Sequence, residues 1–94
     1  MYILPVEHPV PSFEAWKKTF DSDPVGREKS GVRLYRILRP VDSANYVIID
    51  LEFDTMSQAE ALLAALRLSW SRVEGTIMMN PQARIAELVE TKEY

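Results

Sequence analysis

Residues 46 to 53, YVIIDLEF, are the stretch that most constrains the fold of this chain. Large apolar side chains occupy every second position, which is the period of a β-strand with one buried face. These positions are Val47, Ile49, Leu51 and Phe53. The alternate positions carry Tyr46, Ile48, Asp50 and Glu52. The sequence therefore predicts a strand with a wholly apolar face towards a core and a second, mixed face.

Two further strands are predicted before it, at residues 2–8 and 32–39, each bounded by proline or glycine. Between them, Ser12 can cap a helix that carries an aromatic stripe. The stripe, at helical spacing, consists of Phe13, Trp16 and Phe20. Pro5 has no amide hydrogen, so its peptide is expected to face a gap, a bulge or an unpaired side of the sheet.

A longer helix is predicted from about residue 57 to residue 73. Its apolar residues recur at intervals of three and four, which gives one buried stripe. The stripe consists of Ala59, Leu62, Leu63, Leu66, Trp70 and Val73. Two capping boxes compete for the start of this helix. One pairs Ser57 with Glu60 and gives the predicted boundary, and the other pairs Thr55 with Gln58.

Residues 83–90, ARIAELVE, have two interpretations. Their Ala, Glu and Leu residues favour a helix by local propensity. A strand is predicted instead, because the strand at 46–53 needs pairing partners and this is the last segment of the chain. The resulting order βαββαβ is the ferredoxin-like α+β plan, a four-stranded antiparallel sheet with two helices on one face. Residues 1–94 are expected to form a single domain.

The face of the sheet that the helices leave uncovered is expected to be an interface. Three arginines of the second strand, Arg33, Arg36 and Arg39, lie near Asp50 and Glu52 of the third. A face that mixes Ile, Leu and Tyr with opposite charges suits a protein interface better than open water. The sequence therefore predicts a homodimer packed sheet face to sheet face.

Composition and charge argue against several classes of function. The chain carries 11 basic and 14 acidic side chains, a net charge of −3, which argues against general binding of nucleic acid. No apolar run approaches the about 20 residues that span a bilayer. The N-terminus lacks the basic and long apolar regions of a signal peptide, and there are no cysteines for disulfides or metal sites. We expect a cytoplasmic protein with no nucleic-acid or membrane partner.

Three stretches together resemble the dimeric α/β-barrel superfamily. They are EHPVPSFEAWKKTFDSDP, GVRLYRILRPVDSANYVIIDLEFDTMSQAEALL and ARIAELVE. In this resemblance a strand ends near a His and is followed by a W-K-x-x-F-D helix, a G-x-x-x-Y-R strand and an apolar strand ending in E-F-D. The resemblance covers nearly the whole chain and implies a small stand-alone member, similar to uncharacterised antibiotic-biosynthesis-monooxygenase-like proteins.

The superfamily includes cofactor-independent monooxygenases acting on aromatic polyketides, haem-degrading enzymes and lactone isomerases, so the resemblance specifies architecture more than chemistry. Its haem-degrading branch pairs a Trp of the second helix, here Trp70, with a His further along that helix. His8 is the only histidine of this chain, so haem degradation by that arrangement is not expected. The monooxygenase branch usually carries a Trp soon after the third strand, where EFDTMSQAE has none. No cofactor is expected.

His8 is the candidate catalytic residue. Its ordinary pKa of about 6.5 lets a histidine act as an acid, a base or a ligand near neutral pH. It precedes Pro9 at the end of a predicted strand, and no set of metal ligands accompanies it, so no metal site is expected. A structural or surface role is the alternative, and it is the more frequent one for a lone histidine.

Two groups of residues are candidates for ligand binding. Trp16, Phe20 and Trp70 could line a cleft between helices and sheet that suits a flat organic ligand, or they could simply fill the core. The second group could bind an anionic part of a ligand, or could form ion pairs across strands or subunits. It consists of Tyr35, Tyr46, Arg36 and Asp50.

Two functions from different classes remain open. The first is a protein that binds a small apolar or aromatic molecule, in which His8 moves a proton during a cofactor-independent oxygenation or an isomerisation. The second is a non-catalytic ligand sensor or assembly module whose role is the homodimer itself. A pocket touching His8 and both tryptophans would favour the first, and a filled core with His8 in solvent would exclude it. Sequence alone does not decide whether the protein is an enzyme.

Overall fold

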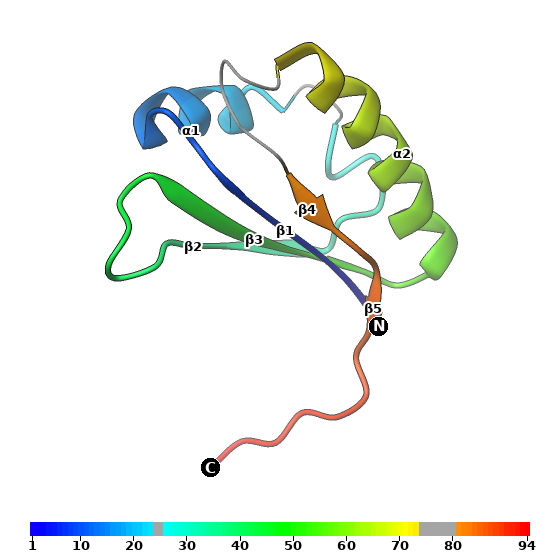
Figure 1. Cartoon of the computed structure of the whole chain (residues 1–94). Coiled ribbons are helices and arrows are strands. Elements are labelled where there is room, and N and C mark those ends of the chain that lie inside the picture. The colour runs from blue at the N-terminus through cyan, green and yellow to red at the C-terminus, as the bar shows by residue number, and fades with distance from the viewer. Residues whose placement is uncertain (24–25, 74–80) are drawn as a thin grey trace.

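A computed structural model describes residues 1–23, 26–73 and 81–94 of the chain. The elements are β1 (Tyr2–Pro9), α1 (Phe13–Asp21), β2 (Leu34–Leu38), β3 (Tyr46–Phe53), α2 (Met56–Val73), β4 (Gln82–Ala83) and β5 (Ala86–Glu87). The strands form one antiparallel sheet in the order β2-β3-β1-β4, and β5 also pairs with β1. Both helices cover the same face of the sheet (Figure 1). The predicted ferredoxin-like α+β fold is confirmed, and neither described helix is long and apolar enough to cross a membrane.

β3 has the predicted bounds, and its side chains alternate between buried and half-buried positions. Its apolar face meets the alternate residues of β1 that point the same way, and both strands pack under the helices. This layer of the core consists of Leu4, Val6, His8, Val10, Val47, Ile49, Leu51 and Phe53. His8 is the one polar side chain of this layer, so the strand that supplies half of the core also carries the candidate catalytic residue.

The last segment is a strand, as predicted, but it is shorter than expected and interrupted. β4 pairs with residues 6–7 of β1 and β5 with residues 2–3, in one continuous register. That register sets Pro5 opposite Arg84, in the gap between the two pieces.

The missing proline donor explains the interruption. The N–H of Val10 donates to the carbonyl of Asn45 on the β3 side, and the N–H of Leu88 donates to the carbonyl of Met1 on the other side. Peptide groups of a strand alternate in direction, so those of the odd positions of β1 face the last strand. Pro5 is one of these positions, and because it has no N–H the ladder lacks a donor there.

The helix boundaries depend on local caps. The hydroxyl of Ser12 accepts the N–H of Ala15 at 3.3 Å and begins α1 as predicted. α2 begins one residue before its predicted start at about residue 57, because the competing frame forms the capping box. The Thr55 hydroxyl accepts the N–H of Gln58 at 3.2 Å, and the Gln58 side chain accepts the N–H of Thr55 at 3.2 Å. The helix therefore begins at Met56.

The apolar stripe of α2 faces the sheet. Leu66 is half-buried, and Leu68, which lies off the stripe, is exposed. The fully covered members of the stripe are Ala59, Leu62, Leu63 and Trp70. The side chain of Val73, the last predicted member of the stripe, is not among those that the structure describes.

Candidate functional site

His8 lies near the end of β1 with its side chain on the helix-covered face of the sheet and 1% exposed. Its ring nitrogen Nδ1 is 3.1 Å from the carbonyl oxygen of Pro9. Burial removes the water that would solvate an imidazolium, and this lowers the pKa of His8 below the usual 6.5, partly opposed by the hydrogen bond to Pro9. His8 is therefore neutral at neutral pH.

The contact with Pro9 also assigns the tautomer of the ring. A carbonyl oxygen only accepts hydrogen bonds, so Nδ1 of His8 carries the hydrogen and donates it to Pro9. In a neutral imidazole the other nitrogen, Nε2, then holds a lone pair. The ring is consequently set up to accept a proton through Nε2.

α1 lays a row of aromatic rings beside His8. The ring centroid of Trp16 lies 6.1 Å from that of His8, edge to face, and 5.1 Å from that of Phe20, nearly parallel. Phe13 lies on the other side of Trp16, with centroids 5.7 Å apart. Phe20 in turn meets Tyr35 of β2 edge to face at 5.0 Å. We call Phe13, Trp16, Phe20 and Tyr35 the aromatic row. It runs from Phe13 to Tyr35 on the edge strand of the sheet, and His8 lies beside its second ring, Trp16.

Arg27 closes the outer end of the aromatic row. Its guanidinium carbon lies 3.7 Å from the ring centroid of Phe20 and 5.1 Å from that of Tyr35. The same guanidinium donates to the Phe20 carbonyl at 2.8 Å and lies 3.5 Å from the Asp23 carboxylate. Sequence reasoning missed this residue. The spacing of Asp23 and Arg27 signals a local ion pair, but nothing in it points to the rings of another strand.

Trp70 comes from α2 and is buried in the same core as Trp16. Within the described part of the chain, its indole makes no ring contact with His8 or with the aromatic row. The structure therefore brings together His8, Trp16, Phe20 and Tyr35, and it places Trp70 in the core without a facing aromatic partner.

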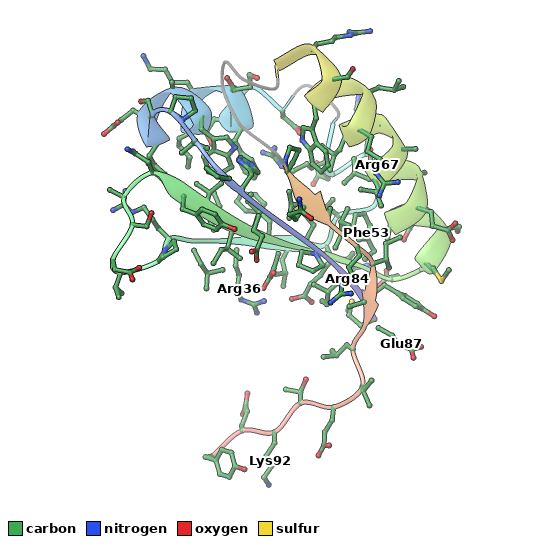
Figure 2. The ribbon with its side chains drawn as sticks, in the orientation of Figure 1. Arg36, Phe53, Arg67, Arg84, Glu87 and Lys92 are labelled. Carbon is green, nitrogen blue, oxygen red and sulfur yellow. The ribbon has the colours of Figure 1, made fainter. Side chains whose placement is uncertain are left out.

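The other predicted residues lie on the opposite, open face of the sheet. The Tyr46 hydroxyl donates to Glu7 at 2.8 Å, and this hydrogen bond to a carboxylate raises the pKa of Tyr46. Arg36 pairs with Glu52 at 2.9 Å rather than with Asp50, its register neighbour, and its side chain points away from the helices (Figure 2). Tyr46, Arg36 and Asp50 are thus separated from His8 by the thickness of the sheet.

The three arginines near this face do not act as one cluster. Arg33 pairs with Asp54 at 2.9 Å, and Arg39 places its guanidinium carbon 4.8 Å from the ring centroid of Phe13 on the helix side. Only Arg36 lies on the open face itself. No group of three or more His, Asp or Glu side chains suited to a metal ion occurs among the residues that the structure describes.

Comparisons of the sequence with protein-family models and with curated proteins give no match. The fold does match solved structures. SnoaB from Streptomyces nogalater, a cofactor-independent oxygenase, has a TM-score of 0.76 at 12% identity, covering 96% of this chain and 94% of SnoaB. A monooxygenase from the ActVA-Orf6 gene of Streptomyces coelicolor, in complex with nanaomycin D, has a TM-score of 0.64 at 16% identity, covering 99% and 91%.

A third structure with this fold holds a different ligand. A MhuD variant with two manganese protoporphyrin IX groups bound per active site matches with a TM-score of 0.65 at 13% identity, and 100% of both chains is covered. Identities this low relate folds, not activities. The chain therefore shares its fold with these proteins, and this is the fold that its resemblance to the dimeric α/β-barrel superfamily implies.

Proposed function

We propose that this protein binds a small, planar organic molecule beside His8 and the aromatic row, and that His8 accepts a proton from it. The observation that carries the proposal is the state of His8, a neutral base held in one tautomer against Trp16. A flat apolar ligand gains from stacking on rings of this kind. A phenol or enol would give its proton to Nε2 of His8.

Deprotonation of the ligand is the step for which the site is equipped. General bases work best when their pKa lies near the ambient pH, and the ordinary pKa of an imidazole meets this condition. Burial lowers the pKa of His8, which keeps the ring in the unprotonated form that a base needs. In a cofactor-independent oxygenation the resulting anion would itself reduce dioxygen, and the protein would orient and deprotonate it. The cofactor-independent oxygenase among the similar structures, and the one with nanaomycin D bound, support this choice of ligand class.

We further propose that the working form is a homodimer packed through the open face of the sheet. On that face Leu34 and Leu38 are 41% and 45% exposed, beside the half-buried Ile48. Covering these apolar side chains with a second copy removes them from water. We also propose the cytoplasm as its location, and a chain without cysteine is compatible with that reducing compartment.

A non-catalytic assembly module is the second candidate. His8 and Trp16 are fully covered in this structure, so a ligand must displace rings of the aromatic row to reach Nε2. Phe13 and Phe20, which are only half-buried, are the rings that would move. If nothing enters there, the site is a packed core and the open face alone carries function.

Binding of planar probes separates the two candidates. We would titrate the protein with 1-naphthol, anthrone and nanaomycin D and follow tryptophan fluorescence, using Trp70→Phe so that Trp16 is the only reporter. Quenching is expected for at least one probe. Oxygen uptake with anthrone should then depend on His8 and be lost in His8→Gln.

The outcomes divide cleanly. Quenching together with His8-dependent oxygen uptake supports an oxygenase, and quenching without oxygen uptake supports a ligand-binding protein. If none of the three probes quenches Trp16, the aromatic-ligand proposal is overturned and the assembly module remains. Leu68→Ala, which changes an exposed residue of α2, is the matched control and should behave as the parent protein does.

A further inference from the structure

We infer that Arg39 binds the anionic end of the ligand, and that the ligand is therefore an elongated planar acid. One end carries the phenol or enol hydroxyl that faces His8, and the other end carries a carboxylate held by the guanidinium of Arg39. The inference rests on the function proposed above and names the substrate class of the same site.

Arg39 and His8 lie in one row across three neighbouring strands. His8 of β1 is paired with Val47 of β3. Leu38, the last residue of β2, lies opposite Ile48 of β3. One residue further along, the same register sets Arg39 opposite Val47. Neighbouring strands are about 4.8 Å apart, so the backbones of Arg39 and His8 are separated by about 10 Å, with β3 between them.

The side chains of this row share the helix-covered face of the sheet. His8 and Val47 are buried there, and the guanidinium carbon of Arg39 lies 4.8 Å from the ring centroid of Phe13 in α1. Phe13 packs on Trp16 with the ring centroids 5.7 Å apart, and Trp16 meets His8. Two rings of the aromatic row thus connect the cation of Arg39 with the base of His8.

Phe13 is the ring that we expect the ligand to displace. It is the first residue of α1 and only half-buried, whereas Trp16 is buried. At the other end of the row, Phe20 lies under the Arg27 guanidinium, which is itself fixed by a hydrogen bond to the Phe20 carbonyl. A ligand ring in the place of Phe13 would keep the contacts with Trp16 and with the cation, and would extend towards His8. A span of this length suits fused rings better than a single ring.

The guanidinium of Arg39 is available to an anion. Arg27, Arg33 and Arg36 each pair with an acidic side chain, but Arg39 forms no ion pair with any residue that the structure describes. A bidentate, charge-assisted hydrogen bond to a carboxylate is stronger than the contact of an exposed cation with a phenyl ring. A carboxylate would therefore draw Arg39 away from Phe13. Because Arg39 is exposed, the charged end of the ligand would stay at the rim of the site while its hydroxyl enters the core.

The test compares two probes that differ only in the anion. They are 6-hydroxy-2-naphthoic acid and its methyl ester, and isothermal titration calorimetry at low salt measures the binding of each. The parent protein should bind the acid about tenfold more tightly than the ester. In Arg39→Gln this preference should vanish, while the ester binds as it does to the parent. Arg67→Gln removes the same charge from an exposed position of α2 (Figure 2), and as the control it should keep the preference.

Failure of this inference is distinguishable from failure of the proposed function. Equal binding of acid and ester by the parent, or a preference that survives in Arg39→Gln, overturns the role of Arg39 and leaves the ligand site standing. If neither naphthalene probe binds but anthrone does, the ligand has no anionic end and the inference alone is overturned. If no aromatic probe binds at all, the proposed function is overturned with it.

Discussion

The imidazole of His8 meets the indole of Trp16 edge to face, with the ring centroids 6.1 Å apart and the planes at 63°. His8 belongs to the central strand β1 and Trp16 to α1, so this contact joins the first helix to the middle of the sheet. Both side chains are buried. A proton added to His8 would therefore place a charge among apolar groups, and this cost links the stability of the fold to pH.

The stability of the protein should fall as the pH drops below 6.5. The unfolded chain binds a proton at His8 near pH 6.5, whereas burial lowers the pKa of His8 in the folded chain. Between these two pKa values the unfolded state holds more protons, so acid favours unfolding in this window and the contribution is fully present above it. Urea denaturation of the parent and of His8→Gln at several pH values from 7.5 to 5.5 measures the effect.

The comparison with His8→Gln isolates this histidine from the carboxylates. The parent should lose stability relative to the variant on going from pH 7.5 to 5.5, since only the parent has the histidine to protonate. If the stability of the parent and of His8→Gln changed in parallel with pH, His8 would have the same pKa in the folded and unfolded chains. Its burial would then not shield it from protonation.

Removing the guanidinium of Arg27 should destabilise the protein by about 2 kcal/mol. Arg27→Met keeps the apolar stem but loses both the contact with the Phe20 ring and the hydrogen bond to the Phe20 carbonyl. Chemical denaturation of Arg27→Met, Phe20→Leu and the double variant measures the coupling between the two side chains. Lys29→Met, an exposed change in the same segment, should stay within about 0.5 kcal/mol of the parent. Strictly additive losses would show that the ring contact contributes nothing.

Leu62→Ala should cost about 2–5 kcal/mol, as expected for truncating a buried leucine. Leu68→Ala on the same helix should cost far less, because Leu62 is 1% exposed and Leu68 is 69% exposed. The two variants make the same chemical change with nearly the same effect on helix propensity, so their difference reports burial alone. Equal midpoints in urea would mean that α2 turns another face to the sheet.

The fold was predictable from the sequence because its strands and helices differ in hydrophobic period. The alternation in residues 46–53 gave β3 with its bounds, and the stripe containing Leu62 gave the buried face of α2. The strand in the last segment was also predicted, although helix propensity opposed it. The strand is interrupted because Pro5 has no amide hydrogen, which the sequence shows. Only the pairing register reveals that this gap faces the last strand, opposite Arg84.

The candidate site was predictable only in part. His8, Trp16 and Phe20 meet as their spacing on β1 and α1 allows. The contact of Arg27 with the Phe20 ring follows no hydrophobic period of the sequence. It could therefore not be predicted from the sequence. The burial of Trp70 was predicted, but its lack of a facing ring depends on the positions of both helices over the sheet.

The start of α2 gives the last test, at a point where the sequence offered two frames. Thr55→Ala should destabilise the protein by about 1 kcal/mol, because the Thr55 hydroxyl accepts the N–H of Gln58 in the capping box. Ser57→Ala should cost clearly less, since Ser57 lies inside the helix and its hydroxyl only meets that of Thr55, at 3.4 Å. Thermal unfolding of both variants measures the difference. A greater loss for Ser57→Ala would restore the frame that pairs Ser57 with Glu60 and would move the start of the helix to residue 58.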